Sequence, residues 1–161
     1  MQNIYENLVM YSDESTDVVP KLATDYSISD DGLTYPFSLQ QGVKFHDGTD
    51  FNAEAVCANF DRWFNWTGLN QSENITYYYG KLMRGFKTGP TSGDALYKNC
   101  EATSATEATI NLNSAFVHFP DAMTLPAFSM QSPTALKKYD ADNTGGTEKD
   151  PRFSEYATAH P

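Results

Sequence analysis

The stretch from Asp30 to Val56 reads DDGLTYPFSLQQGVKFHDGTDFNAEAV and predicts two strands and the start of a helix, separated by turns. Asp31-Gly32 and Asp47-Gly48 mark turns, because Gly tolerates positive φ and Asp can bond its own backbone. Between these pairs, apolar residues alternate with polar or small ones, which is the period of a half-buried strand. Pro36 interrupts the first strand and lacks an N–H group, which favours an edge position or a bulge there.

The helix predicted from Asn52 onward carries one apolar face. Asn52 can cap the helix, and Glu54 lies in the first turn, where the helix dipole favours a negative charge. Apolar residues recur at positions i, i+4, i+7 and i+8, as on a buried helix face, and these are Val56, Phe60, Trp63 and Phe64. We expect this face to pack on the apolar residues of the strands, which are Leu33, Tyr35, Phe37, Val43 and Phe45.

From Ser29 onward, this stretch resembles a motif of the extracellular solute-binding proteins of ABC importers, in the peptide/nickel-binding family. The motif reads S-x-D-G-x-x-Y-x-F-x-L-R-x-G-V-x-F-x-D-G-x-x-x-x-A-x-x-V, and the match is nearly continuous. Other segments resemble further family elements, namely Asn3–Val9 (I-Y-E-x-L), Val19–Ala23 (V-P-x-L-A), Asn59–Arg62 (N-F-x-R) and Ser132–Tyr139 (S-P-x-x-L-x-x-Y). Departures are Pro36 and Gln40, the latter at a position where the family often has Arg.

The resemblance implies an α+β fold, with a small, largely antiparallel sheet and packed helices. Residues 1–161 would form a single domain, a fragment of the first lobe of a two-lobed receptor of the periplasmic-binding-protein type. The implied function is capture of peptides, metal complexes or other small polar solutes for an ABC permease. The implied location is extracellular or periplasmic, with a lipoprotein anchor or signal upstream of this chain. The alternative is a structural or protein–protein interaction subdomain with no direct ligand contact.

Charge and composition exclude several other function classes. The 161 residues carry a formal net charge of −10 with only 11 Lys and Arg, so we expect no nucleic-acid partner and no basic membrane-binding patch. No run of 18 apolar residues exists, so we expect no membrane span. The start, MQNIYENLVMYSDES, has neither a basic region nor an apolar core of the kind found in signal peptides.

Two cysteines, Cys57 and Cys100, are separated by 43 positions and show no metal-ligand spacing. In an exported receptor, as the resemblance implies, we expect them to form one disulfide. The alternative is two separately buried thiols. We expect no metal and no cofactor.

No pattern of catalytic residues is present. His46, His118 and His160 are scattered, and the chain contains neither HExxH, G-x-S-x-G nor S-x-x-K. His46 and Asp47 could suggest a base or a metal site, but the Asp-Gly turn explains their spacing. We therefore expect no enzymatic activity and assign no catalytic residue.

Aromatic residues offer the candidate ligand contacts, which are Trp66, Tyr77, Tyr78 and Tyr79. Tyr and Trp on loops often line ligand clefts, since they supply large contact area at low entropic cost. Three consecutive tyrosines cannot all point inward, so we expect at least one to be exposed. Three N-x-S/T sequons at Asn65, Asn70 and Asn74 would mark a glycosylated loop in a eukaryotic secreted protein. In a bacterial receptor, as the resemblance implies, they indicate only a polar loop.

The remaining segments show weaker patterns. We expect a long loop over residues 67–99 with one helical turn at 77–83, and one strand over 101–113. Short helices are predicted at 116–123 and 132–139, followed by an exposed loop at 140–150. Near the N-terminus, we expect Ile4, Leu8 and Val9 to point inward.

Overall fold

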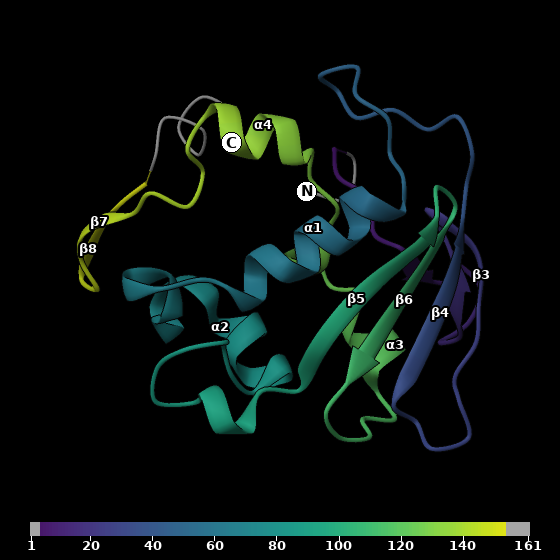
Figure 1. Ribbon diagram of the computed structural model, residues 1–161, viewed down its shortest axis with the longest axis horizontal. Helices are drawn as coiled ribbons and strands as arrows, with labels where there is room; N and C mark the ends of the chain where they lie inside the picture. The colour runs from purple at the N-terminus through teal and green to yellow at the C-terminus, as the bar shows by residue number, and fades with distance from the viewer. Residues whose placement is uncertain (1–3, 154–161) are drawn as a thin grey trace.

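The computed structural model describes residues 4–153 and contains a four-stranded antiparallel sheet covered by helix α1 (Figure 1). The strand order is β3-β4-β6-β5, and the bounds are Ala23–Tyr26 for β3, Thr34–Leu39 for β4, Tyr97–Ser104 for β5 and Glu107–Leu112 for β6. Two further pairs of antiparallel strands form separate two-stranded sheets, β1 (Val9–Tyr11) with β2 (Val18–Pro20) and β7 (Gly145–Thr147) with β8 (Asp150–Arg152). The mixed helical and antiparallel architecture confirms the predicted fold class.

Four α-helices and three 3₁₀ turns complete the described residues. The helices are α1 (Ala53–Phe64), α2 (Glu73–Met83), α3 (Phe119–Ala122) and α4 (Pro133–Lys138), and the 3₁₀ turns are η1 (Gly68–Gln71), η2 (Ser92–Asp94) and η3 (Pro126–Phe128). Within residues 4–153, no helix is long and apolar enough to cross a membrane.

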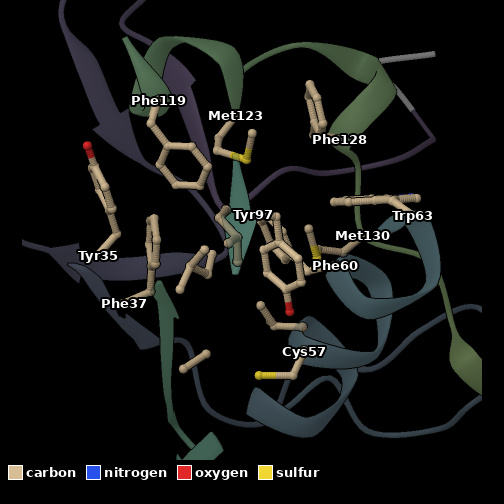
Figure 2. Packing of buried hydrophobic residues seen from close by; sticks show 14 of the residues in the cluster. Tyr35, Phe37, Cys57, Phe60, Trp63, Tyr97, Phe119, Met123, Phe128 and Met130 are labelled. Atoms are coloured by element: carbon tan, nitrogen blue, oxygen red, sulfur yellow. The ribbon is translucent and has the colours of Figure 1, made fainter. Parts of the chain in front are cut away.

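Helix α1 begins as its sequence predicts, but it packs mainly on β5 and β6 rather than on the predicted residues 33–45. The Asn52 side chain accepts a hydrogen bond from the Ala55 N–H at 2.9 Å, which caps the helix. Phe60 is fully buried, with its ring 5.0 Å from Trp63 and 5.8 Å from Tyr97, and Figure 2 shows this cluster. Val56 and Trp63 are buried with it, as are Tyr35 and Phe37 of β4, whereas Phe64, Leu33, Val43 and Phe45 are only half-buried.

A disulfide joins Cys57 of α1 to Cys100 of β5, with 5.1 Å between the two Cα atoms. Strand β5 lies at one edge of the sheet, so the bond fixes the helix to that edge strand. The predicted pairing is therefore confirmed.

The predicted edge position or bulge at Pro36 is wrong. Pro36 lies in β4, an inner strand, and pairs regularly with Thr109 of β6. Its carbonyl accepts a hydrogen bond from the Ser27 N–H at 3.1 Å. In an antiparallel ladder, the N and O atoms of one residue face the same neighbour. The missing N–H therefore faces the side where β3 has ended at Tyr26, and no bond with β6 is lost.

Several other expectations need correction. The predicted single strand at 101–113 is the β5–β6 hairpin, and the predicted single turn at 77–83 is the longer helix α2. Ile4 is exposed rather than buried, although Leu8 and Val9 do point inward. The exposed tail at 140–150 contains part of the β7–β8 hairpin, and the helix predicted over 116–123 is the short α3.

Candidate functional site

Trp66, the first candidate contact, follows the C-terminal end of α1 and is half-buried. Its indole Nε1 donates a hydrogen bond to Asp142 Oδ1 at 2.7 Å. The Arg62 guanidinium lies 5.2 Å from the centre of the indole ring, and the Tyr79 ring contacts it edge-on at 5.7 Å. The indole is thus held in one orientation from three sides.

The three consecutive tyrosines lie on α2 and point in different directions. Tyr79 is only 4% exposed, and its ring stacks on Phe86 at 5.1 Å. Its hydroxyl has no hydrogen-bond partner among the described residues, and burial raises its pKa. Tyr77 and Tyr78 are 54% and 52% exposed, with their rings 5.5 Å apart. Since successive helical residues project about 100° apart, one helix presents Tyr77 and Tyr78 to solvent and buries Tyr79.

A positive side chain lies beside the exposed tyrosines. The Lys81 Nζ is 5.8 Å from the centre of the Tyr77 ring and 2.7 Å from Glu73 Oε1. The ion pair with Glu73 raises the pKa of Lys81, so this lysine is charged at neutral pH. The exposed surface of α2 therefore combines two aromatic rings with a cation and a carboxylate.

Asp142 orients Trp66, and no local sequence pattern predicts this role. Its carboxylate accepts hydrogen bonds from Arg62 Nε at 2.8 and 3.0 Å, in addition to the Trp66 bond. Its backbone carbonyl accepts from Asn70 Nδ2 at 2.7 Å. These partners lie more than 70 positions away along the chain, so only the folded structure brings them together.

A hollow of about 610 Å³ lies away from these aromatics, between three segments at residues 4–6, 43–51 and 130–139. Two of the segments are joined by a backbone hydrogen bond from the Met130 N–H to the Glu6 carbonyl at 2.9 Å. Figure 1 shows the N-terminal end of the described chain beside α4, which forms part of this hollow. Apolar side chains such as Ile4, Val43 and Phe45 form much of its lining.

One carboxylate–hydroxyl cluster in the hollow superficially suggests nucleophilic chemistry. Ser132 donates to Asp47 Oδ2 at 2.5 Å, and Thr49 donates to Oδ1 at 2.6 Å. These two bonds lower the pKa of Asp47. Ser132 also accepts from the Ala135 N–H at 3.2 Å, which caps α4. Ser132 thus donates directly to a weakly basic carboxylate, with no imidazole between them. A serine nucleophile needs an adjacent base to activate it, so this arrangement fits helix capping rather than catalysis.

Metal ligands do not converge in the part of the chain that the structure describes. Among residues 4–153, no three His, Cys, Asp or Glu side chains come together in a group that could hold an ion.

Sequence comparison connects this chain to solute-binding proteins. Residues 17–154 match the family profile described as bacterial extracellular solute-binding proteins, family 5 Middle. The glutathione-binding protein GsiB of Shigella flexneri is 40% identical over 121 residues, covering 73% of this chain and 20% of that protein. GsiB of Salmonella typhi is 38% identical over 133 residues, covering 81% and 22%. The chain thus spans about a fifth of the length of these curated relatives.

Structure comparison gives the same result. The periplasmic binding protein DppA from Helicobacter pylori, in complex with the peptide STSA, aligns with a TM-score of 0.66 and 26% identity. The alignment covers 86% of this chain and 27% of DppA. NikA from Brucella suis, in complex with Fe(III)-EDTA, aligns with a TM-score of 0.61 and 26% identity, covering 83% and 24%.

Proposed function

This chain belongs to the bacterial extracellular solute-binding proteins of family 5. We propose that it forms part of a receptor that captures peptides or similar small polar solutes for an ABC importer. The observation that carries the proposal is the 40% identity to a glutathione-binding protein over 121 residues, since glutathione is itself a small peptide. The structural likeness to DppA in complex with a peptide supports the same class of solute.

The receptor would be longer than the 161 residues described above. The relatives are about five times as long as the part that this chain matches. In the proposed receptor, this chain is a single domain of the first lobe, and solute is enclosed when a second lobe closes over it. Closure of this kind is a hinge motion, driven by higher affinity of the solute for the closed state.

The proposed solute contacts within this chain are Trp66, Tyr77 and Tyr78, at the border of the cleft. The exposure of Tyr77 and Tyr78 supports this role, as do the charges on Arg62 beside Trp66 and on Lys81 beside Tyr77, because a peptide offers both apolar side chains and a carboxylate. Tyr79 is assigned a supporting role, since its buried ring holds α2 against Trp66 and Phe86.

We also propose that the receptor works outside the cytoplasmic membrane, held there by a lipoprotein anchor and docking on an ABC permease. The Cys57–Cys100 disulfide supports this location, because such bonds persist in oxidising compartments.

Isothermal titration calorimetry on the full-length receptor and on the 161-residue chain tests the proposal. We expect the receptor to bind glutathione or a short peptide from a library, and the chain alone to bind none, because it lacks the second lobe.

Replacing Tyr77 and Tyr78 together by Ala is expected to weaken binding by the receptor. Val117→Ala, at an exposed position that is not among the proposed contacts, is expected to leave binding unchanged. Micromolar binding by the 161-residue chain would contradict the two-lobe argument, and a receptor that binds no library member would contradict the function.

A further inference from the structure

The hollow between residues 4–6, 43–51 and 130–139 leaves apolar side chains in contact with solvent. Ile4 is 54% exposed, and Val43 and Phe45 beside it are only half-buried. Contiguous exposed apolar patches on soluble proteins mark sites where another surface or a ligand packs.

Three of the charged groups that line the hollow are already engaged, which argues against a polar solute, and a fourth, Lys138, lies over the Tyr139 ring at 4.9 Å. Of the carboxylates that line it, Glu6 is paired with Lys21 at 3.0 Å, and Asp47 accepts hydrogen bonds from Ser132 and Thr49. Lys44 is paired with Asp50 at 2.5 Å.

Because these groups are already engaged, a charged solute would find few partners for its own charges in the hollow. A free peptide carries an ammonium and a carboxylate group, and burying them without partners costs free energy. The carboxylates best placed to receive the ammonium group are already engaged. Apolar side chains from a protein surface need no such partners and fit the lining better.

The relatives identify where such a surface would come from. The chain covers about a fifth of GsiB and about a quarter of DppA, so most of a receptor of this family lies outside the described residues. Domains within one chain pack through interfaces of about 600–1,500 Å². The hollow, at about 610 Å³ and with a largely apolar lining, can contribute to such an interface.

We infer that this hollow is the face on which the remainder of the receptor packs, through apolar side chains inserted against Ile4, Val43 and Phe45. The inference rests on the proposed function, because it takes this chain to be part of a longer receptor. It assigns the hollow a structural role separate from solute capture, at a different place from Trp66, Tyr77 and Tyr78.

Charge insertion at Ile4 tests the inference, in both the 161-residue chain and the full-length receptor. Because Ile4 is exposed in the chain, Ile4→Asp is expected to leave the thermal midpoint of the chain unchanged. In the receptor, the same change would bury a carboxylate at the interface, so we expect the midpoint to fall by at least about 3 °C. Ile4→Leu keeps the apolar contact and is expected to behave like the wild type. Val117→Asp is the matched control, at a valine that is 77% exposed outside the hollow.

An unchanged receptor midpoint for Ile4→Asp, or an equal loss for Val117→Asp, would overturn the inference. Fluorescence of the dye ANS supplies a second measurement on the two wild-type proteins, so the test survives if the Ile4→Asp receptor fails to fold. We expect the chain to bind ANS more strongly than the receptor does, and displacement of ANS from the chain by glutathione or a short peptide would show a solute pocket instead. Calorimetry of the receptor with peptides tests solute capture separately from packing on the hollow. If the receptor binds no peptide but Ile4→Asp still lowers its midpoint, solute capture fails while the packing inference holds.

Discussion

Tyr97 illustrates how a single buried hydroxyl links packing to ionisation. Its ring stacks on Phe60 at 5.8 Å, and its O–H donates to Asp61 Oδ1 at 2.6 Å. Burial is the larger cause that raises the pKa of Tyr97, and the hydrogen bond to the Asp61 carboxylate raises it further. A phenolate at this place would lose its solvation and face a negative charge, so the folded state retains the proton.

This retention predicts a loss of stability in alkali. An unfolded tyrosine releases its proton near pH 10, whereas folded Tyr97 keeps it to a higher pH, so the unfolded state is stabilised relative to the folded state as pH rises above about 10. We expect the free energy of unfolding, measured in urea, to be steady from pH 8 to 9.5 and to fall above pH 10. Tyr97→Phe is expected to reduce that slope, at a cost of about 1 kcal/mol at pH 8 for the lost hydrogen bond. An alkaline slope identical to that of the wild type would show that Tyr97 does not carry the effect.

At the scale of elements, α1 organises the core because one of its faces contacts both the sheet and the α3 region. Phe60 lies at the centre of this contact, near Tyr97 of β5 and Phe119 of α3. The spacing of Val56, Phe60 and Trp63 was sufficient to predict which face is buried, since the helical period determines it.

Truncation of Phe60 tests the role of this face. We expect Phe60→Ala to lower the free energy of unfolding by about 3–5 kcal/mol, because the neighbouring aromatic rings cannot move in to fill the cavity that it leaves. Phe64→Ala, at a half-buried position on the same helix, serves as the comparison and is expected to cost less. Urea unfolding of both variants measures the difference, and equal losses would mean that the centre of the core lies elsewhere.

The disulfide between α1 and β5 is expected to stabilise the chain mainly by restricting its unfolded state. For a loop of 43 residues, the chain-entropy relation gives about 4 kcal/mol. Replacing Cys57 and Cys100 together by Ser is therefore expected to lower the free energy of unfolding by about that amount. Titration of free thiols in the denatured, non-reduced wild type supplies the control, with none expected. Two reactive thiols, or an unchanged stability in the double variant, would contradict the role of the bond.

The sequence predicted the elements whose signals are local and missed those that depend on distant contacts. The Asn52 cap of α1 and the Asp-Gly turns were predictable because the responsible residues are adjacent in the chain. The β5–β6 hairpin was missed because its turn at Ala105-Thr106 contains no Gly, Pro, Asn or Asp. Helix α2 was underestimated because Gly80 and its polar start are poor helix formers, and burial of Tyr79 and Met83 compensates for this.

The candidate site shows the same division. Exposure of at least one tyrosine followed from helix geometry, but the choice of Tyr79 as the buried member depends on contacts with Trp66 and Phe86. The bond between Trp66 and Asp142 joins residues 76 positions apart, and no local pattern predicts it. The family motif nevertheless predicted membership correctly, because it covers a continuous stretch that folds as one strand–turn–helix unit.

At the scale of the whole molecule, the net charge of −10 opposes folding through self-repulsion. The ion pairs of the described residues offset little of this, because most involve exposed side chains, and exposed pairs contribute about 0–1 kcal/mol each. Arg62–Asp142 is the most sheltered of them, with the arginine side chain 17% exposed. Repulsion among the excess carboxylates is therefore stronger than the attraction within the ion pairs. Salt screens both.

This balance predicts that moderate salt stabilises the chain. Between about 10 and 150 mM NaCl, the Debye length falls from about 30 to about 8 Å, which screens repulsion between carboxylates across the surface. We expect the thermal midpoint at pH 7.5 to rise over this range. Near pH 4.5, the isoelectric point of the sequence, the net charge vanishes, so the rise is expected to disappear. A midpoint that falls with salt at pH 7.5 would show that the ion pairs, and Arg62–Asp142 above all, stabilise the fold more than the excess charge weakens it.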